Sequence, residues 1–141
     1  MSREVHVRFC ERPVVQSHRP TQPHRMGTSR AGKFAMQVST MKKRLRRALV
    51  AIAAWCREHM HTPLEYQQQM LNAKLRGHYQ YYGRPTNYRS LEKFVFTVRR
   101  TWRRWLARRT RGRHLPWPRY IRILARYPLL RPRITHAWAV R

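Results

Sequence analysis

The chain has 141 residues, of which 42% are hydrophobic, so it can form one domain with a modest core. Its 32 Lys and Arg residues face only 5 acidic residues, and the formal net charge of +27 indicates a polyanionic partner. Most of the basic residues are Arg, whose planar guanidinium binds phosphate through two hydrogen bonds, which favours nucleic acid over a lipid surface.

All five acidic residues are Glu, and the chain contains no Asp. Two-metal phosphoryl transfer needs clustered carboxylates to hold its cations, and acid–base pairs need two carboxyl groups in one site. The Glu residues are scattered, so neither arrangement is expected. A catalytic base at His78 or a nucleophile at Tyr81 would need a defined set of supporting partners, and no motif indicates one. We therefore expect a protein that is not an enzyme and that binds no metal or cofactor.

The two cysteines, Cys10 and Cys56, are too few for a four-thiolate zinc site and form no Cys-x-x-Cys pair. We expect reduced thiols in an intracellular protein. No run approaches the roughly 18 apolar residues of a membrane span, and the N-terminus lacks the apolar core of a secretion signal. The expected location is a bacterial cytoplasm or nucleoid. An organellar location is less favoured, because Glu4, Glu11 and nearby prolines interrupt an amphipathic transit helix.

The N-terminal segment, residues 1–38, shows no sustained periodicity and contains three prolines, which predicts an irregular or disordered arm. Within this arm, the alternation of apolar and polar residues from Arg30 to Val38 predicts a short strand or an extended stretch. The remaining residues, 39–141, are predicted to form one helical domain.

Apolar residues at spacings of three and four predict four helices in this domain. The first covers about residues 40–59, with Ser39 as its N-cap. The second starts at Thr62-Pro63-Leu64-Glu65, where Thr is the N-cap, Pro occupies the first helical position and Glu completes a capping box. Gly83 and Pro85 end this helix.

The third and fourth helices follow a turn at residues 84–87. The third covers about residues 88–109 and has the cleanest apolar stripe in the chain, formed by Leu91, Phe94, Val95, Val98, Trp102, Trp105 and Leu106. The fourth covers about residues 117–126 and ends before Pro128. Residues 129–141 are expected to lie as an extended segment over the bundle. The predicted fold is all-α, a small bundle of three main helices plus a short fourth.

Gly77 interrupts the second helix, where glycine costs about 1 kcal/mol relative to alanine. A close approach to its backbone would explain its presence. Tight packing against another helix is the first interpretation, and a nucleic-acid backbone against this helix is the second.

The three long helices each pair an apolar stripe with a stripe of Arg or Lys, so packing the apolar stripes together turns the cationic stripes outward onto a common surface. Such a surface binds phosphates with salt-sensitive affinity and carries little sequence information. Specificity would come from unpaired bases stacked on rings near the turn that precedes Tyr88. Tyr79 and Tyr82 lie on the core stripe, whereas His78 and Tyr81 lie off it and are expected to reach a ligand.

The chain contains three basic segments in a distinctive order and spacing: Lys42–Leu49 (KKRLRRAL), Leu71–Gly83 (LNAKLRGHYQYYG) and Val98–Leu106 (VRRTWRRWL). Together they resemble the maturase-specific region of group II intron reverse transcriptases. The later Tyr-Pro-Leu and Pro-Arg-Ile triplets, at 127–129 and 132–134, are similar to the end of that region. The resemblance covers about residues 27–138. It implies a mostly helical, thumb-like domain that binds intron RNA so that the RNA folds and splices itself.

The sequence also departs from that family. Full-length members carry an upstream polymerase domain with a Tyr-Ala-Asp-Asp metal site, and a chain without Asp cannot contain it. Some members end in a His-Asn-His endonuclease domain with paired cysteines, which this sequence lacks. Residues 1–26 do not resemble the polymerase end, whereas residues 27–34 resemble the linker into the maturase region. The expected origin is therefore a truncated or frameshifted intron reading frame.

The resemblance and the charge together predict an RNA-binding module that assists intron RNA folding and splicing by neutralising phosphates where RNA helices pack closely. Its expected partners are group II intron RNA and, as a further possibility, a separate reverse-transcriptase polypeptide, with no membrane. The predicted RNA contacts are Lys43, Arg46, Arg47, Arg76, His78, Tyr81, Arg100, Arg103, Arg104 and Arg108.

Three alternatives belong to other classes. A general basic DNA-binding or nucleoid-type protein would bind duplex DNA as well as intron RNA. An inactive remnant of an intron-encoded reverse transcriptase would order only when docked on a separate polymerase subunit. A membrane-active amphipathic protein is disfavoured, because the Trp-rich and Leu-rich stripes can bury one another.

Overall fold

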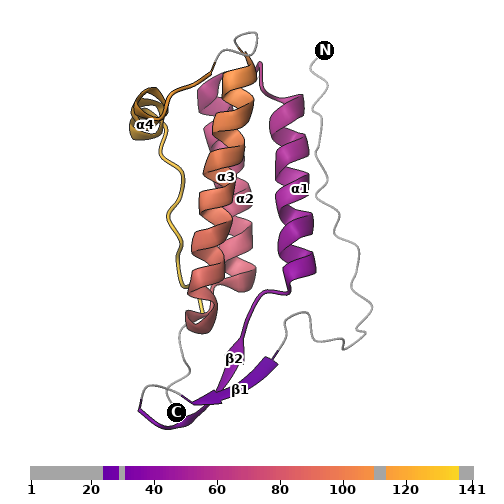
Figure 1. The fold of residues 1–141 in the computed structure, drawn as a ribbon, viewed down its shortest axis with the longest axis vertical. Helices are drawn as coiled ribbons and strands as arrows, with labels where there is room; N and C mark the ends of the chain where they lie inside the picture. The colour runs from indigo at the N-terminus through magenta and orange to yellow at the C-terminus, as the bar shows by residue number, and fades with distance from the viewer. Residues whose placement is uncertain (1–23, 29–30, 110–113, 137–141) are drawn as a thin grey trace, which may run out of the picture.

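The computed structural model describes residues 24–28, 31–109 and 114–136. Three long helices lie side by side, and a short fourth helix lies across one end of the bundle (Figure 1). These helices are α1 (Lys42–Glu58), α2 (Leu64–Tyr82), α3 (Tyr88–Arg109) and α4 (Trp117–Arg126). The predicted all-α bundle of three main helices plus a short fourth is confirmed, and α3 and α4 have the predicted bounds.

The start of α1 differs from the prediction, because a tertiary contact and not a local cap sets it. The N-cap position is Met41, which makes no side-chain cap, so the assignment of Ser39 as N-cap is wrong. Thr40 is buried, its N–H donates to Asn87 Oδ1 over 2.9 Å, and Asn87 Nδ2 donates to Thr40 Oγ1 over 2.7 Å. Asn87 belongs to the 3₁₀ turn η1 (Pro85–Asn87), which thereby holds the chain just before α1.

The predicted capping box of α2 is also wrong. Pro63 occupies the N-cap position, and the Thr62 hydroxyl donates to the carbonyl of His59 over 2.7 Å and does not bond α2. The Thr62 carbonyl accepts a hydrogen bond from Gln67 Nε2 over 2.8 Å. The loop between α1 and α2 is therefore closed by Gln67 from inside the bundle.

The N-terminal arm contains a β-hairpin in its described part. Strand β1 (His24–Thr28) pairs antiparallel with β2 (Phe34–Val38), with His24 opposite Val38. The prediction of a strand within residues 30–38 is confirmed, whereas β1 falls in a stretch that was expected to be irregular. Gly32, in the connection, has φ of 72°, a backbone conformation that glycine adopts without strain. The hairpin lies at the end of the bundle opposite α4 (Figure 1), and residues 1–23 lie outside the described residues.

The core is centred on Trp102 of α3, which is fully buried as predicted. Its Nε1 donates to Gln67 Oε1 of α2 over 2.8 Å, which satisfies the polar atom that a buried Trp brings with it. On its other side, the ring of Tyr120 from α4 meets it edge-on with 6.0 Å between centroids. The Tyr120 hydroxyl donates to the Arg99 carbonyl over 2.8 Å, so α4 is bonded directly to α3.

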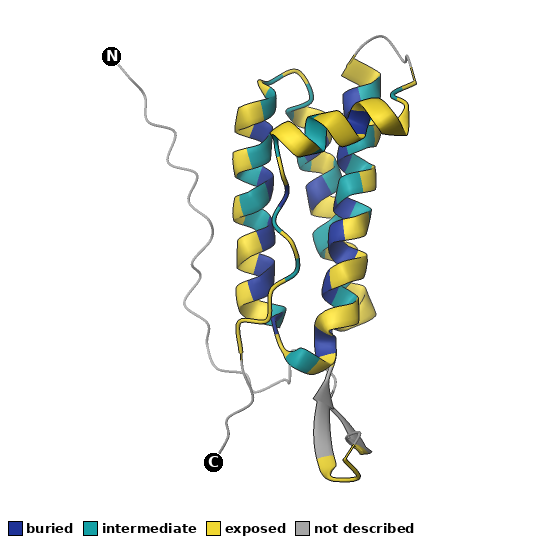
Figure 2. Cartoon of the chain, turned by 90° about the vertical axis from the view of Figure 1, so that its left-hand side faces the viewer, coloured by how far each residue is buried: buried dark blue, intermediate teal, exposed yellow. Residues whose placement is uncertain are grey.

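The chain after α4 forms a C-terminal strap, residues 127–136, which runs back along α2 and α3 (Figure 2). Asn72 Oδ1 accepts from the Leu130 N–H over 2.9 Å, and the Tyr79 hydroxyl donates to the Leu130 carbonyl over 2.8 Å. Gln68 Nε2 donates to the Pro128 carbonyl over 2.9 Å. The predicted extended segment over the bundle is thus confirmed through residue 136, and residues 137–141 lie outside the described residues.

Two glycines of the α2 segment have opposite surroundings. The N–H groups of Thr135 and His136 both donate to the Gly83 carbonyl, and a Cβ on Gly83 would collide with the Tyr79 carbonyl and the Thr135 side chain. Around a Cβ on Gly77, by contrast, no atom of the described residues would lie within 4 Å. Helix packing therefore does not explain Gly77, and that interpretation is wrong. The nucleic-acid interpretation stays a prediction.

The two glycines should respond oppositely to alanine. Gly77→Ala should raise the free energy of unfolding by about 1 kcal/mol, because it improves helix propensity without a collision. Gly83→Ala should lower it by about 1–3 kcal/mol, because the added methyl displaces the strap. Urea unfolding of the two variants beside the wild-type protein measures both changes. Equal effects in one direction would contradict the described packing of the strap.

Candidate nucleic-acid interface

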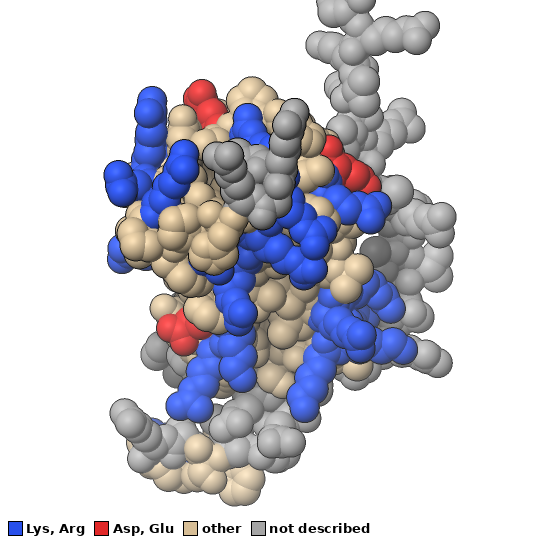
Figure 3. Space-filling model, turned by 45° about the horizontal axis from the view of Figure 1, so that its top comes forward, with Lys and Arg blue, Asp and Glu red and all other residues tan. Residues whose placement is uncertain are grey.

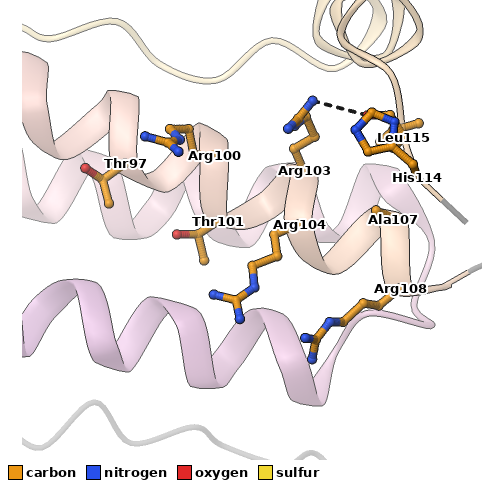
Figure 4. A pocket seen from close by; sticks show the side chains of 9 residues that line it. All are labelled: Thr97, Arg100, Thr101, Arg103, Arg104, Ala107, Arg108, His114 and Leu115. Carbon is orange, nitrogen blue, oxygen red and sulfur yellow. Dashed lines mark hydrogen bonds between the residues drawn. The ribbon is translucent and has the colours of Figure 1, made fainter. Parts of the chain in front are cut away.

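The outer side of α3 carries a cluster of arginines. Arg100, Arg103, Arg104 and Arg108 recur at spacings of three and four, which places them on one side of the helix. They line an open depression of about 570 Å³, which we call the arginine pocket (Figure 4). The other residues that line it are Thr97, Thr101, Ala107, His114 and Leu115.

The arginine pocket is built for an anion. Among the described residues that line it there is no carboxylate, so its four guanidinium groups have no counter-charge within the pocket. Like charges held this close repel one another, and an anion that enters removes part of that repulsion. Guanidinium groups bind phosphate in a bidentate geometry, which makes a phosphate oxygen the best match to this lining.

Arg103 is held in place by the segment that leads into α4. Its guanidinium donates to the Leu115 carbonyl over 3.2 Å and stacks over the ring of Trp117, 4.1 Å from the ring centroid. In Figure 4, Arg104 and Arg108 point the other way, toward α1. No sequence signal indicates Trp117 or Leu115 in this site, because the contact depends on how α4 returns to α3.

The three predicted contacts on α1 share one side of that helix, because they are three and four residues apart. Lys43, Arg46 and Arg47 are exposed on the first half of α1, which packs along α3. Figure 3 shows Lys and Arg side chains gathered over the face that α1, α3 and α4 form. These α1 residues do not line the arginine pocket. They lie in the first turns of α1, next to the start of α3, where Thr40 is bonded to Asn87, whereas the pocket lies toward the end of α3.

Two predicted contacts on α2 lie apart from this site. Arg76 lines a different depression of about 460 Å³, between α2 and the strap, together with Gln80 and Arg133. Tyr81 is 47% exposed, as expected for a residue off the core stripe. The ten predicted residues therefore do not form one common surface, because the strap covers the side of α2 next to Arg76.

His78 does not reach the surface, and its assignment as an RNA contact is wrong. Only 9% of the residue is exposed, and its ring stacks on Phe94 with 3.7 Å between centroids. The buried side of α2 is wider than the predicted stripe, because position 78 follows Leu71 and Leu75 at helical spacings of seven and three. Burial lowers the pKa of His78 to about 4, so the ring is neutral at physiological pH.

The predicted core positions of Tyr79 and Tyr82 are confirmed, and Tyr81 as an RNA contact stays a prediction. Tyr79 is buried, and Tyr82 packs against the core from a half-buried position.

Cys56 is a free, buried thiol, and burial raises its pKa to about 12. Cys10, Glu4 and Glu11 lie outside the described residues. Within the described ranges, no three His, Cys, Asp or Glu side chains group so as to hold a metal ion, and no helix has the length and apolarity of a membrane span.

Comparison of the chain with models of protein families, with curated proteins and with solved structures found no match. The resemblance to the maturase region therefore stays a prediction from the three basic segments and the two later triplets. Lys42–Leu49 lies in α1, Leu71–Gly83 spans the second half and end of α2, and Val98–Leu106 lies in α3.

Mild acid should destabilise the fold through His78. The pKa is about 4 in the folded protein against 6.5 for the ordinary ring, so between these values the unfolded chain binds more protons. The free energy of unfolding should therefore fall as the pH drops from about 6.5 to about 4. Urea unfolding across this range measures the slope. His78→Phe keeps a ring against Phe94 and should reduce the slope, and an unchanged slope in this variant would contradict the assignment.

Proposed function

We propose that this protein binds folded RNA through the arginine pocket and the basic surface around it, as an RNA-binding module of the group II intron maturase type. The observation that carries the proposal is the pocket itself. Four arginines gather on one side of α3 with no carboxylate among the described residues that line the site. Such a site binds phosphate oxygens and leaves base sequence unread.

The mechanism is charge neutralisation. Folded RNA brings phosphates of separate helices close together, and their repulsion opposes close packing. Guanidinium groups at the junction offset that repulsion and fix the approach of the two backbones. Arg103, stacked on Trp117, is a fixed donor, whereas Arg104 and Arg108 extend toward α1. The protein makes and breaks no bond, and the RNA carries out its own splicing.

The choice of group II intron RNA over other polyanions is supported by the resemblance. The segment Val98–Leu106 contributes Arg100, Arg103 and Arg104 to the arginine pocket. The segment Lys42–Leu49 contributes the exposed cations of α1. A general DNA-binding protein would use the same phosphate chemistry, so competition between nucleic acids separates the two functions.

The arginine pocket should account for a defined part of the salt dependence. Arg104→Gln and Arg108→Gln should each weaken RNA binding and lower the slope of log affinity against log salt by about one unit. Arg89→Gln is a matched control, because Arg89 is an exposed arginine of α3 that does not line the pocket. Equal losses of RNA affinity in all three variants would mean that any exposed arginine contributes equally and that the arginine pocket is not a specific binding site.

Intron selectivity is tested by equilibrium competition. The full chain is bound to a self-splicing group II intron RNA and displaced by a structured RNA or a DNA duplex of equal length, across a salt series. A preference for the intron that persists at high salt is expected, since non-specific phosphate contacts weaken most steeply with salt. Equal affinity for all three that collapses with salt would contradict the maturase-type function and leave a general polycation.

A further inference from the structure

A second depression lies on α3, on the side that faces the strap. It has a volume of about 450 Å³ and is lined by Tyr88, Glu92, Phe96 and Arg99 of α3 and by Arg131 and Pro132 of the strap. It adjoins the arginine pocket, because the Arg100 guanidinium of that pocket lies 5.7 Å from the ring centroid of Phe96. We call it the aromatic pocket.

Exposed rings distinguish the aromatic pocket from the arginine pocket. Phe96 is 57% exposed and Tyr88 is 38% exposed. Phe94 and Trp102 of the same helix, by contrast, are buried in the core of the bundle. The Arg100 guanidinium lies over the Phe96 ring, and the exposed remainder of the ring is open to a stacking partner. Every nucleobase has a flat face that can stack on an aromatic ring, so such stacking does not depend on the identity of the base. Cations beside the ring bind the phosphate of the same nucleotide.

The polar lining also fits a base better than a bare phosphate. Glu92 would repel a phosphate, but a carboxylate accepts hydrogen bonds from the exocyclic amino group of a base. Arg99 has a buried Nε–H with no acceptor among the described residues. Because that atom is closed to solvent, a bound nucleotide would reach Arg99 through its terminal guanidinium nitrogens and not through Nε. Arg131 supplies a second cation from the opposite wall.

The wall that the strap forms is fixed in place before any ligand arrives. The residue before Arg131, Leu130, is bonded on both backbone polar groups, to Asn72 through its N–H and to Tyr79 through its carbonyl. The aromatic pocket is therefore held open by the fold and needs no loop to close over it, which lowers the entropy that binding must offset.

We propose that the aromatic pocket binds an unpaired nucleotide of the same RNA whose phosphates enter the arginine pocket. Its base stacks on Phe96, and its phosphate contacts Arg99 or Arg131. This inference rests on the proposed function, because it places a single-stranded nucleotide next to the phosphate site. The aromatic pocket would give the protein a preference for RNA that contains an unpaired base, which the arginine pocket alone does not provide.

The test compares two RNA probes of equal length, a single-stranded oligoribonucleotide and a fully paired duplex. Phe96→Leu should weaken binding of the single strand by roughly tenfold and leave duplex binding unchanged, since one base loses its stacking partner. Phe96→Trp should keep the wild-type affinity for both, because it retains a ring. Ile121→Ala is the control, since Ile121 is 58% exposed on α4 and does not line the pocket. Circular dichroism verifies that each variant is folded.

A single-strand affinity that is unchanged in Phe96→Leu, or equal losses for strand and duplex, would overturn the aromatic pocket. The arginine variants keep this result separate from the proposed function. If Arg104→Gln weakens the duplex while Phe96→Leu has no effect, the aromatic pocket fails alone. If Arg104→Gln weakens neither probe while Phe96→Leu weakens the single strand, the arginine pocket fails and the aromatic pocket remains. Photo-crosslinking from a 4-thiouridine strand should label the tryptic peptide 94–99, and labelling only elsewhere would also overturn the assignment.

Discussion

Burial of the apolar side of α3 is the constraint on which the rest of the structure depends. Trp102 contacts Gln67 of α2 and Tyr120 of α4, so one helix joins the other parts of the bundle. Because that side is buried, the arginines of α3 can only lie outside. The formal net charge of the chain is +27, so these arginines repel one another and other cations of the chain, and an anionic partner reduces that repulsion. Stability and the proposed binding site thus arise from the same helix.

The chain after α3 shapes the surface as well as stabilising it. The segment that enters α4 holds Arg103 against Trp117, and the strap brings Arg131 to the aromatic pocket. Without these returning segments, the outer side of α3 would be a plain row of cations. With them, it has one depression lined by arginines and hydroxyl groups and another lined by rings, cations and one carboxylate. Both suit RNA that combines packed helices with an unpaired nucleotide.

Periodicity was sufficient for α3 and α4, whose bounds follow from apolar spacing and flanking prolines. It failed at the starts of α1 and α2 for different reasons. Before α1, Asn87 binds Thr40 from 47 residues away, so a tertiary contact replaces the predicted cap. Before α2, the contact is local but is not the predicted capping box, because the Gln67 side chain donates to the Thr62 carbonyl. Periodicity also placed His78 outside the core, because the buried side of α2 is wider than one stripe. In the candidate site, the arginines were predictable from sequence, but Trp117 and Arg131 were not. Their contacts exist only once α4 and the strap fold back.

Protection of individual arginines from chemical modification tests the central claim most directly. The full chain is treated with phenylglyoxal, with and without bound intron RNA, and each modified arginine is located by mass spectrometry. Arg100, Arg104 and Arg108 should be strongly protected by the RNA, whereas the exposed Arg89, outside the arginine pocket, should remain reactive. Uniform protection of all arginines, or protection that leaves out the pocket, would contradict RNA binding through α3.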